Sequence, residues 1–197
     1  MRGTAGRAPL AGERDRLRQL QPVPPRLGAA LRAGVVARTR HRGAGRVKVS
    51  GERTFAAPRE VVWQVLNDPT AMAATIPGVE SFDVQDEQHW RANVKIPLGL
   101  GTLGMTLNME KVEQREPELA RLAIKGEGVG AMLNMTTAFA LSEDGGGGST
   151  KMDWEADVHL AGPVGSMGQR VLQPIVSQQV QQVLASLDEQ VAKAQAQ

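Results

Sequence analysis

The sequence predicts an α+β fold, in which a curved antiparallel sheet of about seven strands packs around one long C-terminal helix. Residues 80–160 consist mainly of segments in which apolar and polar residues alternate, which is typical of strands with one buried face. Residues 164–194 instead place an apolar residue at nearly every fourth position, which is typical of an amphipathic helix. A proline-led segment between the first strand and the others favours two short helices.

Length and composition indicate one domain with an aliphatic core. The chain has 197 residues, of which 41% are hydrophobic, 22% are charged and only 3% are aromatic. This length suits a single domain. Because the chain has no cysteine, disulfides, thiolate metal sites and cysteine nucleophiles are excluded. The sequence shows neither a run of about 18 apolar residues nor a signal-peptide pattern, so we expect a cytoplasmic protein.

Residues 1–46 differ in character from the rest and are expected to form a disordered basic tail. They contain eleven basic and two acidic residues, a formal charge of +9, whereas residues 47–197 carry −7. Three interpretations stay open: an electrostatic arm for an anionic membrane or nucleic acid, a flexible leader without function, or a mis-assigned start with translation beginning at Val47. The ligand-binding domain is expected to span residues 47–197.

The first elements of this domain are a strand and two short helices. Residues 48–55 alternate as a strand. Pro58 opens a helix, because proline is favoured at the first helical position, and the helix ends by Asn67-Asp68-Pro69. A second helical piece at residues 70–75 leads into a turn at Pro77-Gly78.

The remaining strands form the body of the sheet and precede the last helix. They are expected at residues 80–85, 90–98, 103–109, 120–126, 133–141 and 151–160. The helix is expected to run from Val164 to about Ala194, a length of about 45 Å. Pro174 lacks an amide donor, so a bend is expected there.

A twisted sheet and a rod-like helix touch along a line, so space is expected to remain between them. Apolar side chains facing this space would form a cavity for an apolar ligand, and flexible methionines would let the walls adapt. The alternative is that the methionines only fill core volume. The expected lining residues are Trp63, Ile76, Val94, Ile96, Leu98, Leu103, Met105, Leu107, Met109, Met135, Phe139, Met152, Trp154, Met167, Val171 and Ile175.

Few polar residues are candidates for chemistry near this cavity. Glu52, Glu110 and Arg170 are the polar candidates, and Arg170 would pair with a carboxylate or a ligand headgroup. Each has a structural role as the alternative. We predict no catalytic residue and no metal ligand, because a triad or acid-base pair is hard to assemble from these groups.

Two other patterns carry weaker signals. Residues 99–104 match the glycine spacing of a dinucleotide-binding loop, but a strand is expected to follow, so no helix N-terminus would meet a phosphate. We interpret them as a glycine-rich hairpin at the mouth of the cavity. Asp153, Glu155, Asp157 and His159 share the outer face of one strand, where solvation is the simplest role and contact with a partner the alternative.

Four segments together resemble the CoxG family of carbon monoxide dehydrogenase proteins. They are Val47-Lys48-Val49-Ser50-Gly51-Glu52, the Pro58 helix with Trp63, Ile76-Pro77-Gly78-Val79-Glu80, and Ala161-Gly162-Pro163-Val164-Gly165-Ser166-Met167-Gly168-Gln169-Arg170. The resemblance covers residues 47–197. It implies the helix-grip fold of the START and birch-pollen-allergen-like (SRPBCC) superfamily. It further implies binding of a quinone or other lipid, and assistance in assembly or membrane recruitment of a molybdenum carbon monoxide dehydrogenase or related hydroxylase.

The leading hypothesis is therefore a non-catalytic binding protein that requires no cofactor and carries a quinone or lipid. Its expected partners are an apolar small molecule, a molybdenum hydroxylase and the inner face of the cell membrane, with no nucleic acid. The alternatives are an enzyme of the same fold, such as a polyketide cyclase, and an assembly factor whose cavity is vestigial. An enzyme would need several ionisable groups in the cavity, and the inward positions are mainly apolar.

Overall fold

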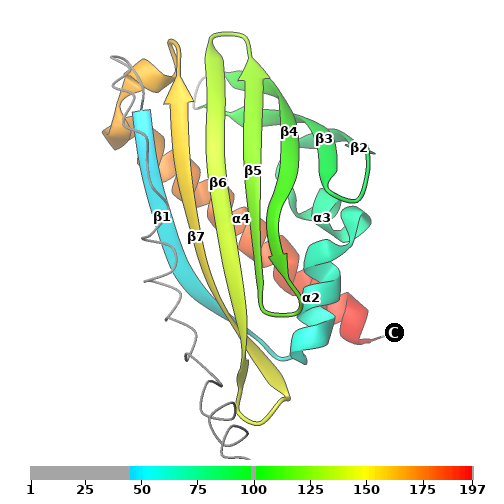
Figure 1. Cartoon of the computed structure of the whole chain (residues 1–197). Coiled ribbons are helices and arrows are strands. Elements are labelled where there is room, and N and C mark those ends of the chain that lie inside the picture. Colours follow the sequence, from blue (N-terminus) through cyan, green and yellow to red (C-terminus); the bar gives the residue numbers. More distant parts are fainter. Residues whose placement is uncertain (1–44, 99–100, 197) are drawn as a thin grey trace, which may run out of the picture. The chain divides into compact units, whose positions relative to one another are not determined.

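The computed structural model describes residues 45–98 and 101–196, and it confirms the α+β fold (Figure 1). Seven antiparallel strands form one sheet in the order β1-β7-β6-β5-β4-β3-β2. The strands are β1 Gly45–Phe55, β2 Val79–Val84, β3 His89–Pro97, β4 Thr102–Arg115, β5 Leu119–Gly128, β6 Ala131–Asp144 and β7 Ser149–Ala161. Strands β2 to β7 follow one another as hairpins, and β1 closes the sheet beside β7.

Two short helices carry the chain from one edge of the sheet to the other. They are α2, Arg59–Asn67, and α3, Pro69–Thr75. The break between them lies at Asp68, whose side chain accepts a hydrogen bond from the Ala71 amide at 2.7 Å and so caps α3. The fully buried Thr150 hydroxyl donates to the Ala57 carbonyl at 2.7 Å, which ties the start of α2 to β7.

The long helix α4, Gln169–Gln195, covers the concave face of the sheet, as Figure 1 shows. Its backbone packs mainly against β1, α2 and α3. Leu172, Leu184, Leu187 and Val191 are its buried residues. The strands in the middle of the sheet are therefore not the principal backbone contacts of α4, which leaves side chains to fill the intervening space.

The C-terminal helix begins later than the sequence predicts. A short 3-10 helix, η2 (Gly165–Met167), comes first, and α4 starts only after Gly168. Gly168 has φ +79° and ψ 163°, a conformation that is open essentially to glycine alone and that interrupts the helix. The expected continuous helix from Val164 was therefore wrong at its N-terminal end.

Two strands are also longer than expected. Strand β4 continues to Arg115 through a register shift between Lys111 and Glu113, where a bulge adds twist to the sheet. Strand β1 begins at Gly45, which pairs with Leu160, so Gly45 and Arg46 belong to the domain. The rest of the expected basic tail, residues 1–44, lies outside the described residues, and the interpretations of it stay predictions.

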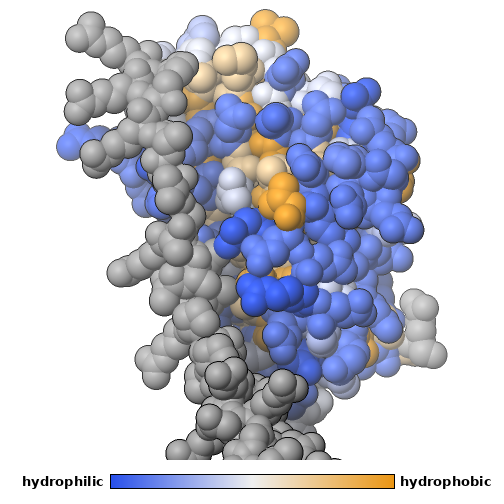
Figure 2. All heavy atoms as spheres, viewed as in Figure 1, coloured by the Kyte–Doolittle hydropathy of each residue, from blue (hydrophilic) through white to orange (hydrophobic). Residues whose placement is uncertain are grey.

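The outer face of the sheet is mainly hydrophilic, as Figure 2 shows for the side viewed in Figure 1. This polar face and the buried concave face follow from strict alternation, for example in β4, where Leu103, Met105, Leu107 and Met109 are all buried. Among the described residues, no helix is long and apolar enough to cross a membrane.

Candidate functional site

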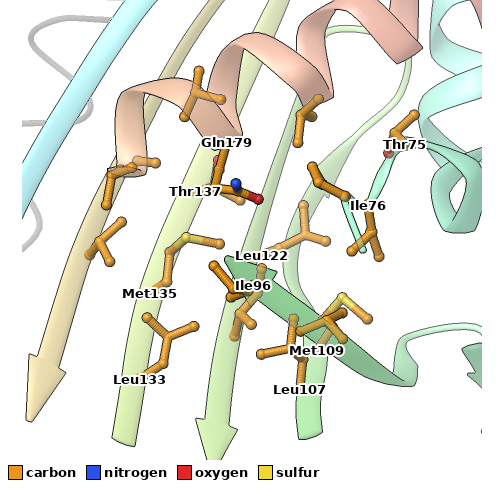
Figure 3. A pocket seen from close by; sticks show the side chains of 18 of the residues that line it. Thr75, Ile76, Ile96, Leu107, Met109, Leu122, Leu133, Met135, Thr137 and Gln179 are labelled. Atoms are coloured by element: carbon orange, nitrogen blue, oxygen red, sulfur yellow. The ribbon is translucent and has the colours of Figure 1, made fainter. Parts of the chain in front are cut away.

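A cavity of about 330 Å³ lies between the concave face of the sheet and α4, with α3 at one side. Strands β3 to β7 supply most of its walls, and α4 supplies one face of its helix, including Ile175, Gln179 and Val183. Figure 3 shows the side chains of Ile96, Leu107, Leu122 and Met135 projecting from the strands toward the helix.

The cavity walls are almost wholly apolar. Among the described residues that line it, none is Asp, Glu, Lys, Arg or His. Thr75, Thr137 and Gln179 contribute the polar side chains. The Thr75 hydroxyl donates to the Met72 carbonyl at 2.8 Å, and the Thr137 hydroxyl donates to the Glu155 carbonyl at 3.0 Å. Both hydroxyls are thus satisfied by the backbone, so the cavity presents a neutral surface suited to an apolar guest.

Most of the residues that the sequence predicts for the lining do face this cavity. They are Ile76, Val94, Ile96, Leu98, Leu103, Met105, Leu107, Met109, Met135, Phe139, Met152, Trp154 and Ile175. The strand residues among them share one face by alternation. Trp154 extends over Gly51 of β1, where any side chain would collide with the indole.

Three apolar residues expected in the lining lie elsewhere. Trp63 is buried in α2, with its ring centroid 6.2 Å from that of Phe139 in an edge-to-face contact, so it packs behind the wall and not in it. Met167 and Val171 are each 48% exposed. Their spacing of four residues spans the interruption at Gly168, so they do not share the helical face that continues to Ile175.

The three polar candidates also lie outside the cavity. Glu52 is exposed on β1 and pairs with Lys151, whose Nζ lies 2.9 Å from Glu52 Oε1; this hydrogen bond lowers the pKa of Glu52. Glu110 is exposed because it alternates with the buried Met109. Arg170 is exposed in the first turn of α4, so the structure places it away from any guest in the cavity.

The sequence analysis did not single out a further set of lining residues. Besides Gln179, these are Leu66, Met72, Thr75, Pro77, Leu122, Ile124, Leu133, Thr137, Ala138, Ala156, Val158, Leu160, Val164, Leu172, Val176, Val180, Val183, Leu184 and Leu187. A signal for Gln179 was available, because it is the one polar residue in the series that recurs every four positions through the helix.

The acidic face of β7 is part of an ion-pair network with β1. The Arg46 guanidinium binds both carboxylate oxygens of Asp157, and Lys48 Nζ lies 3.4 Å from the same carboxylate. The hydrogen bond from Arg46 lowers the pKa of Asp157. In the described part of the chain, no cluster of His, Asp or Glu side chains is arranged to hold a metal ion.

The glycine-rich segment has no phosphate-binding geometry in its described part. Gly99 and Leu100 lie outside the described residues, and strand β4 begins at Thr102. The Leu98 amide donates to the Gly101 carbonyl at 2.8 Å, which closes the β3–β4 connection. Because a strand follows the glycines, no helix N-terminus is present there, as the sequence predicts. Its place at the cavity mouth stays a prediction.

Comparison with solved structures shows the fold. A conserved protein from Geobacillus kaustophilus is similar with a TM-score of 0.70 and 20% identity, covering 75% of this chain and 97% of that chain. A START superfamily protein from Mycobacterium smegmatis has a TM-score of 0.59 and 16% identity over 74% of this chain and 97% of its own. The Zhui aromatase/cyclase of a Streptomyces species has a TM-score of 0.55 and 14% identity, over 76% and 94% of the two chains.

Comparison with protein families gives a more specific result. No curated protein sequence matches the chain. The family model of the carbon monoxide dehydrogenase protein CoxG, however, matches residues 51–192, which include β2 to β7, α2, α3, most of α4 and the whole cavity lining. Such a match extends over most of the chain and agrees with the START-like architecture. The chain therefore belongs to the carbon monoxide dehydrogenase CoxG family.

Proposed function

We propose that this protein is a non-catalytic carrier that binds a quinone or another apolar lipid in the cavity between α4 and the sheet. The observation that carries this proposal is a cavity of about 330 Å³ whose described lining has no ionisable side chain. Its size is within the range of small-molecule sites. A guest that buries about 300 Å² of apolar surface there would gain about 7 kcal/mol before the costs of binding, which suits reversible carriage.

The lining favours binding over catalysis. General acid-base catalysis requires a titratable group within hydrogen-bond reach of the substrate, and nucleophilic catalysis usually requires an activated side chain. Thr75 and Thr137 are the hydroxyl-bearing residues in the described lining, and both donate to backbone carbonyls. The cyclase alternative, which the similarity to an aromatase/cyclase keeps in view, lacks an acid-base pair here.

Membership of the family supplies the rest of the proposal. The bound molecule would serve a molybdenum carbon monoxide dehydrogenase or related hydroxylase, during its assembly or its recruitment to the membrane. The competing proposal is an assembly factor with a vestigial cavity. It differs in one respect that can be measured, because it predicts tight binding to the hydroxylase by a protein that carries no guest.

Native mass spectrometry of the protein purified from its own host, followed by solvent extraction, tests carriage directly. We expect a co-purifying isoprenoid or lipid. The variant Met135→Trp should lose it, because the larger ring would fill space opposite α4 (Figure 3). Val84→Trp, at a position 54% exposed, is the matched control and should retain the guest. Wild-type protein without a guest, or equal loading of the two variants, would contradict the carrier proposal.

An exposed apolar cluster supports the membrane part of the proposal. Val129 is 96% exposed in the β5–β6 turn, and Met132 nearby is 57% exposed. The Val164 amide donates to the Gly130 carbonyl at 3.2 Å, which brings the cavity-lining Val164 to this turn. Apolar side chains at a loop tip can insert into the interface of a bilayer.

Sedimentation with anionic phospholipid vesicles tests this contact with the full chain. Val129→Asp should reduce the bound fraction severalfold, because a charge would have to enter the interface. Val112→Asp, at a position 48% exposed on β4, is the control for an added charge and should bind like the wild type. Equal reduction by both variants would indicate plain electrostatic repulsion and no apolar insertion.

A further inference from the structure

Gln179 is the polar residue of α4 that reaches the cavity. Its neighbours at four-residue spacing, Ile175 and Val183, also line the cavity, so this face of the helix is otherwise apolar. Figure 3 shows the carboxamide of Gln179 extending from the helix into the cavity, next to Thr137 of β6. The side chain is half-buried. It therefore places a donor and an acceptor within an oily surface.

This carboxamide has no hydrogen-bond partner among the described residues, whose side-chain hydrogen bonds do not include it. Leaving an amide unpaired in apolar surroundings costs free energy, so a glutamine at such a position disfavours the protein unless something pairs with it. The adjacent Thr137 hydroxyl has already given its proton to the Glu155 carbonyl, and it can only accept a further hydrogen bond. Trp154, on the same wall, has a buried Nε1 that lacks a partner in the described structure.

The position of these groups on the sheet is compact. Thr137 pairs with Ala156, and Trp154 pairs with Phe139, so Thr137 and Trp154 occupy diagonal positions on the neighbouring strands β6 and β7. Both line the cavity opposite α4. The cavity thus has one polar region, and the remaining described walls offer no other hydrogen-bonding side chain except Thr75, whose hydroxyl donates to Met72.

We propose that Gln179 is the specificity-determining residue of the cavity, where its carboxamide binds the carbonyl or hydroxyl oxygen of an uncharged apolar guest. The inference rests on the proposed carrier function and adds the chemical selectivity of the site. A hydrocarbon would leave the carboxamide unpaired. A carboxylate or phosphate would also bind poorly, because the described lining offers no cation to compensate its loss of water.

Three naphthalene probes of similar shape separate these possibilities: 2-acetylnaphthalene, 2-isopropylnaphthalene and 2-naphthoate. Equilibrium dialysis against the full chain, with the free probe measured by absorbance, gives each dissociation constant. For the wild type we expect the ketone to bind about tenfold more tightly than the isopropyl compound, and the carboxylate to bind most weakly. Naphthoate binding as tightly as the ketone would overturn the proposal.

The variant Gln179→Met tests the residue itself, because it keeps the side-chain length and removes the amide. We expect ketone affinity to fall about tenfold while affinity for the isopropyl compound is unchanged or rises. Gln178→Met, the same substitution at the neighbouring exposed position, should behave like the wild type and reports any indirect effect on α4. Circular dichroism checks that both variants retain the native helix content.

The outcomes distinguish the anchor from the carrier function. If both neutral probes bind to the wild type and Gln179→Met weakens them equally or not at all, the anchor is refuted and the carrier proposal stands. If neither neutral probe binds to the wild type, the cavity does not accept apolar guests, and both proposals fail together.

Discussion

At the scale of single residues, position on a strand decides whether a side chain meets the cavity or the solvent. Met105, Met109 and Met135 line the cavity, whereas Met132 is 57% exposed. Glu110, one residue after Met109, is exposed for the same reason. The alternating pattern thus predicted most lining residues correctly as to face.

Alternation could not predict which inward side chains reach the cavity and which pack behind it. Trp63 is buried, yet it contacts Phe139 from α2 and does not line the space. Gln179 was recognisable only as an irregularity in an apolar series, and its meaning depends on the strand that faces it. Such distinctions depend on the distance between elements, which the pattern of a single chain does not contain.

The ion pair between Arg46 and Asp157 is expected to make stability depend on pH. The hydrogen bond from Arg46 lowers the pKa of Asp157 in the folded protein. Its stabilisation is therefore fully present above the pKa of the unfolded state and is lost as the pH falls through the lower, folded-state pKa. Asp157→Asn should reduce the free energy of unfolding by about 1 kcal/mol at neutral pH, a discounted value for a partly exposed pair.

Urea unfolding of Asp157→Asn and wild type between pH 7 and pH 3 checks this dependence. The difference between them should shrink below about pH 4, where carboxylates protonate. Asp153→Asn is the matched control, because Asp153 has only a long contact of 3.6 Å with Lys151 on the same face of β7. A difference that persists unchanged at pH 3 would show that the loss has another cause.

At the scale of elements, the order of strands and helices was predictable because each has a local signal. The proline-led start of α2 and the alternation in β3 to β7 follow from residues near in sequence. The start of α4 was not predicted. The apolar spacing continues through Met167 and Val171 as though one helix ran from Val164, and only the backbone at Gly168 shows the interruption.

Gly168→Ala is expected to destabilise the fold through this junction. The φ of +79° and ψ of 163° are unfavourable for any residue with a Cβ, at a cost of about 1 to 3 kcal/mol. No atom lies within 4 Å of the added Cβ, so the effect would come from the backbone alone. Gly148→Ala, also free of nearby atoms and without a positive φ, is the control, and it should change the urea midpoint little.

At the scale of the whole molecule, the sheet and helix form a neutral container within a charged exterior. The outer face of the sheet carries the ion pairs of β1 and β7, while the described cavity lining holds no ionisable group. The composition predicted an apolar interior in general terms. It could not predict this complete separation, which depends on which neighbours face one another across strands β1 and β7.

The separation makes ionic strength a practical means of telling the two kinds of contact apart. Dissolved salt screens the attraction between exposed charges over about 10 Å at 0.1 M, but it has no charge to screen on the described walls of the cavity. Raising sodium chloride would then release charged partners from the exterior while the guest stays inside. A single wash could in this way strip the outer surface and leave the cargo for identification.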